Sequence, residues 1–205
     1  MAYVEVSDIK AFLEIESNAD DTIIENLIEA SKKVIDEHCG RTFESWGDIN
    51  EHGHRHTIYR YTPLPQKYGG DILADGLTLM LGDDCCEVHE VINGDNVVIP
   101  STEYITLPAN VSPKYAIKLR QSSTYRWTYS IHPEQSVRVE GVFAFSMHAP
   151  EDIIQASRLL VKYFYTTRAD SSDSDRTIVS GGVTMTPSQI PKSVLSILKP
   201  YVRLS

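Results

Sequence analysis

Three histidines at alternate positions are the residues whose spacing most directly suggests chemistry. His52, His54 and His56 form an HxHxH pattern. Alternate side chains of a β-strand lie on one face, so three imidazoles at this spacing could meet at one metal ion. No carboxylate or cysteine ligand stands beside them at a recognisable spacing. We therefore predict no metal and no cofactor, and a metal-dependent enzyme centred on these histidines is kept as an alternative.

Carboxylates and thiols offer weaker candidates for catalysis. Asp83, Asp84 and Glu87 could act as paired carboxylates, but a solvated turn is the simpler interpretation. The chain contains no GxSxG elbow, no GxxxxGK[ST] phosphate loop and no GxGxxG. Its three cysteines are an odd number, and Cys85 and Cys86 are adjacent, which argues against a disulfide framework. These patterns predict that the protein is not an enzyme.

Aromatic residues alternate along one further stretch. Tyr125, Trp127 and Tyr129 could form a stacking platform, which would make the protein a carbohydrate-binding tail accessory module. The favoured interpretation is one aromatic face of a strand that packs on the core or on a neighbouring subunit.

Composition limits the remaining classes. A chain of 205 residues suffices for one buried core, or for a core with a smaller subdomain. The net charge of −9 leaves no basic stripe for tight nucleic-acid binding. No apolar run approaches the roughly 20 residues that span a bilayer, so no membrane partner is expected. The first residues lack a signal-peptide pattern, which favours a cytoplasm-like compartment.

Apolar residues at helical spacing predict three main helices. Ser7 is expected to cap a first helix over 7–13. The strongest pattern covers 21–39, with aspartates at its positive end and Gly40 suited to a left-handed C′ position. A third helix is expected to begin at Pro150 and to pack on the second, because neither can bury its apolar face alone.

Between the second and third helices the pattern changes to short strands and turns. Asn93-Gly94 predicts a two-residue hairpin turn with positive φ at both positions. The expected strands lie at 77–81, 88–92, 97–99, 104–107, 116–119 and 137–145. We therefore predict an antiparallel β-subdomain inserted between helices.

The C-terminal end combines a polar segment with a short amphipathic helix. Residues 170–190 begin with a low-complexity polar run and are expected to form a flexible loop. An apolar face tethered by such a loop is costly to leave exposed, and it suits docking onto a partner. The predicted docking residues are Pro191, Val194, Leu195, Leu198, Pro200, Tyr201, Val202 and Arg203.

These elements together predict an α+β protein. It is a small antiparallel helical bundle with an inserted antiparallel β-subdomain and a short C-terminal docking helix. The expected parts are N-terminal helices over 1–43, a β-rich insertion over 44–148, a third bundle helix over 149–169, a flexible loop over 170–190 and a docking segment over 191–205.

The order of segments at both ends of the chain is distinctive. Tyr3-Val4 precedes the first helix, and Arg41-Thr42-Phe43 follows the second. The third helix follows Val139-Glu140-Gly141-Val142-Phe143, and Ile190-Pro191 opens the C-terminal segment. This arrangement resembles the head–tail connector (adaptor) proteins of long-tailed bacteriophages and related gene-transfer particles. The long insertion over 43–150 departs from the short members of that family.

The resemblance implies a structural virion protein of the neck, at the head–tail interface, made in the host cytoplasm. Such connectors form a ring, usually of twelve copies, beneath the portal protein. The ring extends the DNA channel and docks the next neck (stopper) protein. By resemblance, residues 191–205 would grip the portal. Double-stranded DNA would pass without specific binding, which suits an acidic chain.

Overall fold

The chain divides into two compact units. The computed structural model describes residues 2–45, 48–49, 55–169 and 190–203. Met1–Arg41 and Ala149–Ser205 form the helical unit, and Thr42–His148 form the β unit. Helices and an antiparallel sheet are thus segregated along the chain, which confirms the predicted α+β class. The predicted flexible loop over 170–190 lies outside the described residues except for its last position.

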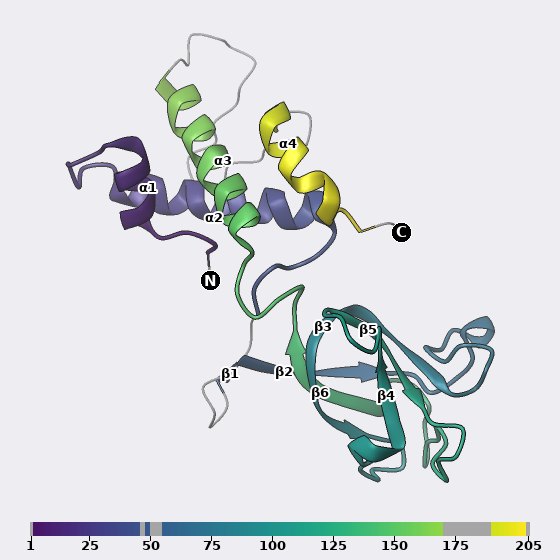
Figure 1. Ribbon diagram of the computed structural model, residues 1–205. Helices are drawn as coiled ribbons and strands as arrows, with labels where there is room; N and C mark the ends of the chain where they lie inside the picture. Colours follow the sequence, from purple (N-terminus) through teal and green to yellow (C-terminus); the bar gives the residue numbers. More distant parts are fainter. Residues whose placement is uncertain (1, 46–47, 50–54, 170–189, 204–205) are drawn as a thin grey trace. The chain divides into compact units, whose positions relative to one another are not determined.

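Among the described residues, four α-helices build the helical unit (Figure 1). α2 and α3 pack on each other, α1 touches both, and α4 packs on α3. None of these described helices combines the length and apolar composition that a membrane-spanning segment requires. Their bounds are Val6–Leu13 for α1, Asp21–Cys39 for α2, Glu151–Ala169 for α3 and Lys192–Leu198 for α4, with a 3₁₀ turn, η4, over Lys199–Tyr201.

The first two helices begin and end at residues suited to those positions. α2 has the predicted bounds, and Gly40 closes it with a φ of +64°, which glycine adopts without strain. The predicted cap of α1 was wrong by two residues. Glu5, rather than Ser7, is the N-cap, and it forms a capping box with Asp8.

Buried polar pairs join the helices across the unit. Ser31 on α2 and Ser157 on α3 are fully buried, and their hydroxyl oxygens lie 2.9 Å apart. Tyr165 near the end of α3 donates a hydrogen bond of 2.6 Å to Asp20, which precedes α2. A buried hydroxyl without a partner is costly, so these pairs favour one alignment of α3 along α2.

The β unit is a sheet of six described strands in the order β1-β2-β6-β3-β5-β4, with every neighbouring pair antiparallel (Figure 1). Its core lies on one face of the sheet and includes Leu79, Leu81, Val91, Ile117 and Val139. The strands are Asp48–Ile49 (β1), Arg55–Tyr61 (β2), Thr78–Ile92 (β3), Tyr104–Leu107 (β4), Lys114–Leu119 (β5) and Val137–Phe143 (β6).

β3 differs from its prediction because it is one long strand rather than two short ones. Its register with β5 shifts between Met80 and Cys85, and its register with β6 shifts twice more. Such bulges bend a strand and let it continue past residues that break the alternation of apolar and polar side chains. The polar run at Asp83 and Asp84 therefore lies within β3, and the predicted solvated turn at this point was wrong.

The chain does turn back after β3, but not through the predicted two-residue turn. The backbone carbonyl of Asn93 accepts a hydrogen bond of 2.9 Å from the amide of Asn96. Asn96 is the residue of this turn that adopts a positive φ, at +65°. Gly94 has another reason to lack a side chain, because a Cβ there would lie 2.4 Å from the carbonyl oxygen of Thr128. The return segment forms only an isolated bridge between Ile92 and Val98.

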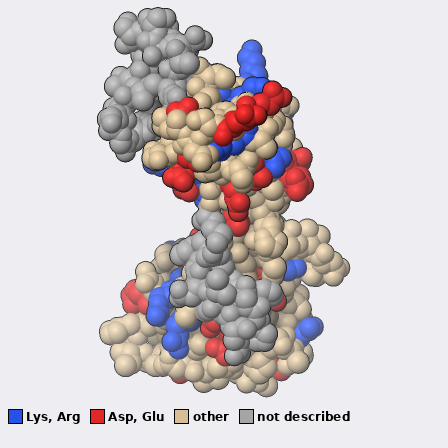
Figure 2. Space-filling model, turned by 90° about the vertical axis from the view of Figure 1, so that its left-hand side faces the viewer, with Lys and Arg blue, Asp and Glu red and all other residues tan. Residues whose placement is uncertain are grey.

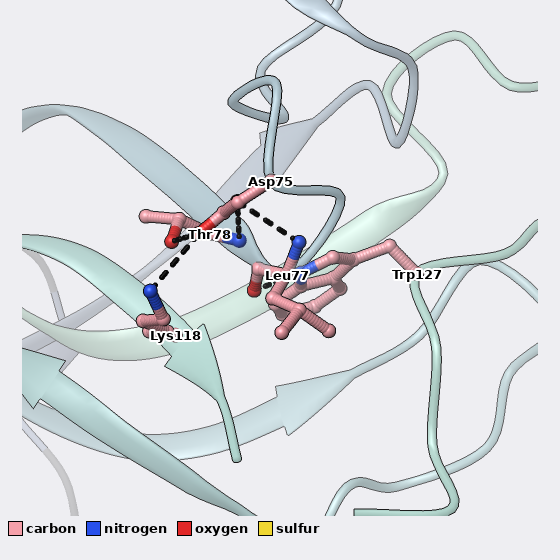
Figure 3. A network of polar contacts seen from close by, with 5 residues as sticks. All are labelled: Asp75, Leu77, Thr78, Lys118 and Trp127. Atoms are coloured by element: carbon pink, nitrogen blue, oxygen red, sulfur yellow. Dashed lines mark hydrogen bonds and ion pairs between the residues drawn. The ribbon is translucent and has the colours of Figure 1, made fainter. Parts of the chain in front are cut away.

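A carboxylate fixes the start of β3 (Figure 3). Asp75 accepts hydrogen bonds from the Leu77 amide at 3.0 Å and from the amide and hydroxyl of Thr78 at 2.9 and 2.7 Å. Lys118 on β5 forms an ion pair with it at 3.0 Å. Burial raises the pKa of Asp75, but these hydrogen bonds outweigh that effect and hold its pKa well below the ordinary value. The indole of Trp127 donates to the Leu77 carbonyl at 2.7 Å, which ties a third segment to this point.

Candidate docking surfaces

The C-terminal segment, whose apolar face was predicted to be available to a partner, buries that face within the helical unit. Val194 and Leu198 are fully buried, and Ile190 is nearly so. α4 packs on α3, so the chain itself covers these side chains. The expectation of an exposed apolar face on this helix was therefore wrong in its physical premise. An apolar stripe predicts burial, but it does not say whether another protein or the same chain provides the cover.

Two hydrogen bonds hold the end of this segment in place. The Tyr201 hydroxyl donates to Asp152 on α3 at 3.1 Å, and the Arg203 amide donates to the Cys39 carbonyl at the end of α2 at 2.8 Å. Burial, together with the hydrogen bond and the negative charge of Asp152, raises the pKa of Tyr201. The segment thus joins the ends of two helices that are far apart in the sequence.

The remaining predicted docking residues lie nearer the surface. Pro200 and Val202 are exposed, with 36% of Val202 accessible to solvent. Pro191, Leu195, Tyr201 and Arg203 are partly buried. α4 ends at Leu198, and Lys199, which adopts helical angles, begins η4. A partner that contacts this segment as it stands meets the polar outer face of α4, η4 or the residues after it.

The histidine cluster provides no described metal site. His52 and His54 lie outside the described residues. His56 pairs through its backbone with Asp48 of β1, and its side chain is not described. Within the described ranges, no group of three or more histidine, cysteine or acidic side chains is placed to hold a metal ion.

The aromatic stretch splits between the core and the surface. Tyr125 and Trp127 pack against the hydrophobic core of the β unit, and the Trp127 indole is engaged with Leu77. Tyr129 alone of the three is exposed, at 43%. A flat stacking platform needs neighbouring exposed rings. The favoured interpretation, one aromatic face against the core, therefore describes two of these residues. The predicted strand was wrong, because this stretch is irregular except for an isolated bridge between Gly94 and Tyr129.

Thiols and phenols in the β unit have pKa values moved away from neutrality. Burial raises the pKa of Cys85 to about 12 and that of Cys86 to about 11. Burial, with the charge and hydrogen bond of Asp83, raises the pKa of Tyr59 to about 12. Acid–base and nucleophilic catalysis favour groups that titrate near the working pH. These side chains stay protonated at neutral pH, as expected for packing residues.

Both units are acidic overall, but charged side chains cluster within each of them. Residues 1–41 contain ten acidic and four basic side chains. Figure 2 shows acidic side chains spread over the visible face of the helical unit, and Lys and Arg side chains gathered on part of the β unit. One basic group, Arg60 with Arg138, lines a surface cavity that the sequence did not reveal, because the two residues lie on strands far apart in the chain.

The N-terminal part of the chain is similar to a known protein family. Residues 3–65 match the family model of the Phage gp6-like head-tail connector protein. The match spans α1, α2, β1 and β2, which is under a third of the chain. It confirms the connector resemblance predicted from the N-terminal residues. No curated protein sequence matches the chain.

Solved structures extend the likeness to nearly the whole fold. A chain from "Neck of native GTA particle computed with C12 symmetry" aligns with a TM-score of 0.54 and 13% identity, covering 98% of this chain and 88% of that one. A chain from "Virion of native gene transfer agent (GTA) particle" aligns with a TM-score of 0.53 and 15% identity, covering 99% and 91%. At such low identity the likeness shows a shared fold.

Proposed function

We propose that the protein is a structural head–tail connector of a phage-like particle. The observation that carries this proposal is the match of residues 3–65 to the connector family model. The similar fold of chains from a gene-transfer-agent neck and virion supports it. The raised pKa values of Cys85 and Cys86 are also consistent with a packing role rather than a chemical one.

In this role the protein forms a ring beneath the portal, extends the DNA channel and docks the next neck protein. The C12 symmetry named for one structural neighbour supports a twelve-membered ring. The protein then resides at the head–tail interface of the virion after assembly in the host cytoplasm. Double-stranded DNA passes through the ring, and the net charge of −9 disfavours its retention.

The portal contact is assigned to the outer side of the C-terminal segment. Because Val194 and Leu198 are buried in the helical unit, the contact falls on the exposed Pro200 and Val202, with the partly buried Tyr201 and Arg203 beside them. A short exposed end that is anchored by hydrogen bonds at Tyr201 and Arg203 presents a preordered surface. Preordering lowers the entropy cost of binding.

Co-sedimentation of the full-length chain with its portal protein tests this assignment. Val202→Asp places a charge on the proposed contact, and Val97→Asp makes the same change at an exposed valine of the β unit. We expect Val202→Asp to abolish co-sedimentation without lowering the melting temperature, and Val97→Asp to retain it. If Val202→Asp co-sediments like the wild type, the C-terminal contact is wrong.

Electron microscopy of the portal complex tests the connector role separately. A ring of this protein under the portal, and particles that fail to join tails in its absence, are the expected results. Normal tail joining by particles that lack the protein would contradict the proposed role, whatever the outcome at Val202.

A further inference from the structure

An open cavity of about 280 Å³ lies on the surface of the β unit. It forms where β2 and β6 meet the turn after β3 and the segment that leads into β6. No acidic side chain belongs to its lining. The polar lining residues are Arg60, Asn96, Ser130, His132, Ser136 and Arg138.

The two arginines face each other across neighbouring strands. Arg60 on β2 is the register partner of Arg138 on β6, so their side chains leave the same face of the sheet. Like charges directly opposite each other in an antiparallel pair are destabilising. Arg138 donates a hydrogen bond of 3.1 Å to the Asn96 side chain, which is neutral. In the described part of the chain, neither arginine forms an ion pair with a carboxylate.

Nearby acidic residues do not occupy the cavity. Asp95 accepts a hydrogen bond of 3.1 Å from the Val97 amide within its own turn. Glu140 lies two positions along β6 from Arg138 and is the register partner of Ile58. Neither carboxylate belongs to the lining. The positive charge of the cavity is therefore not balanced from inside it.

We propose that this cavity, the Arg60–Arg138 pocket, binds a phosphate group. A guanidinium presents a planar fork of N–H donors that matches the oxygens of a phosphate. The hydroxyls of Ser130 and Ser136 already donate to the carbonyls of Gly94 and Pro133. The arginines, His132 and the side-chain NH2 of Asn96 remain as donors. The paired N–H donors of one guanidinium are enough for the two oxygens of a carboxylate. Two opposed guanidinium groups with an imidazole suit a phosphate, which has more oxygens.

The open position of the pocket favours the backbone of duplex DNA as the source of that phosphate. A single local contact of this kind is compatible with weak overall DNA binding by a chain whose net charge is −9. Arg60 and His132 are both exposed, so a rigid polyanion can reach them without a change in the fold. A free phosphate ion is the other source of the same chemistry. The inference does not depend on the connector role, because the charges and their geometry belong to the β unit alone.

Thermal unfolding of the full-length protein tests for the site. Sodium phosphate is compared with sodium chloride at equal ionic strength, for the wild type, Arg60→Gln, Arg138→Gln and the control Lys67→Gln. Lys67 is an exposed cation of the same unit outside the pocket. We expect phosphate to raise the melting temperature of the wild type and of Lys67→Gln, and the gain to disappear in both arginine variants. Arg60→Lys, which keeps the charge and loses the fork, should retain only part of the gain.

Folding of the arginine variants is checked in the same experiment. In chloride, Arg60→Gln should melt no lower than the wild type, because it removes a repulsion rather than a contact.

Fluorescence anisotropy with a labelled DNA duplex then separates the two sources. If the backbone is the source, each arginine variant weakens binding across sequences and lowers the salt slope by about 1. A phosphate effect without any effect on DNA binding assigns the pocket to free phosphate. If the wild type and all variants have the same melting temperature in phosphate as in chloride, the proposed phosphate site is wrong. Altered self-association of the arginine variants, with no phosphate effect, also overturns it, because the pocket then holds a carboxylate of a second copy.

Discussion

Leu198→Ala tests most directly whether α4 belongs to the core of the helical unit. Leu198 is fully buried, and α4 packs on α3. A helix of seven residues is too short to be stable by itself, so packing must hold it in helical form. Truncating the leucine therefore removes apolar contacts and leaves a cavity in this unit.

The expected cost follows from that burial. Replacing a fully buried leucine by alanine lowers the free energy of unfolding by about 2–5 kcal/mol. A unit of this size loses about 4–8 °C of melting temperature per kcal/mol. A loss of about 3 kcal/mol therefore corresponds to roughly 12–24 °C.

Urea unfolding followed by far-UV circular dichroism measures the effect, since the described helices lie in one unit. Val202→Ala is the matched control, because Val202 lies four residues later and is 36% exposed. Its cost should stay within about 0.5 kcal/mol. If Leu198→Ala costs as little as Val202→Ala, α4 is a free docking segment and its packing on α3 does not hold in solution.

Three further changes probe the interior of each unit. Asp75→Asn should destabilise the protein at neutral pH by an amount on the order of 1 kcal/mol, measured by urea unfolding. Because the folded-state pKa of Asp75 is below its ordinary value of 3.8, its contribution is present above about pH 4 and is lost as the pH falls further, so the difference from wild type should shrink in acid. Gly141→Ala should destabilise the β unit by about 3 kcal/mol or more, because a Cβ there would lie 2.3 Å from the carbonyl oxygen of Glu87. We expect the β unit to unfold at a lower urea concentration while the helical signal stays unchanged. A wild-type unfolding midpoint would contradict this prediction. Ser31→Ala should lower the free energy of unfolding by about 1–3 kcal/mol, because it leaves the buried Ser157 hydroxyl without its partner. Adding Ser157→Ala should recover part of that loss. Additive losses in the double-mutant cycle would show that the two serines are not coupled.

Local patterns predicted the helices well because a helix depends on neighbours in the sequence. The bounds of α2 follow from its apolar stripe and from Gly40, which needs no distant partner to adopt a positive φ. The connector resemblance was also visible in this part of the chain, and residues 3–65 match the family model.

Features that depend on distant segments could not be predicted in the same way. The continuity of β3 is set by its pairing with β5 and β6, and its bulges interrupt the alternation that marks a strand. Gly94 suggested a tight hairpin, yet its need for a small side chain comes from Thr128, more than thirty residues away. The Arg60–Arg138 pocket likewise exists only because two strands pair in one register.

The C-terminal segment shows why this distinction matters for function. The stripe that includes Val194 and Leu198 predicts that the helix will be covered, but any apolar surface satisfies that demand. Here α3 provides the cover, and the same side chains cannot also face a portal while they fill this core. A docking role for the segment must therefore use the exposed Pro200 and Val202, or else must break the packing of Leu198. In the second case Leu198 itself would face the portal, so Leu198→Ala would remove part of the contact and weaken the association. In the first case Val202→Asp would abolish the association, and Leu198→Ala would act only by loosening α4, so one co-sedimentation series with both variants distinguishes the two modes.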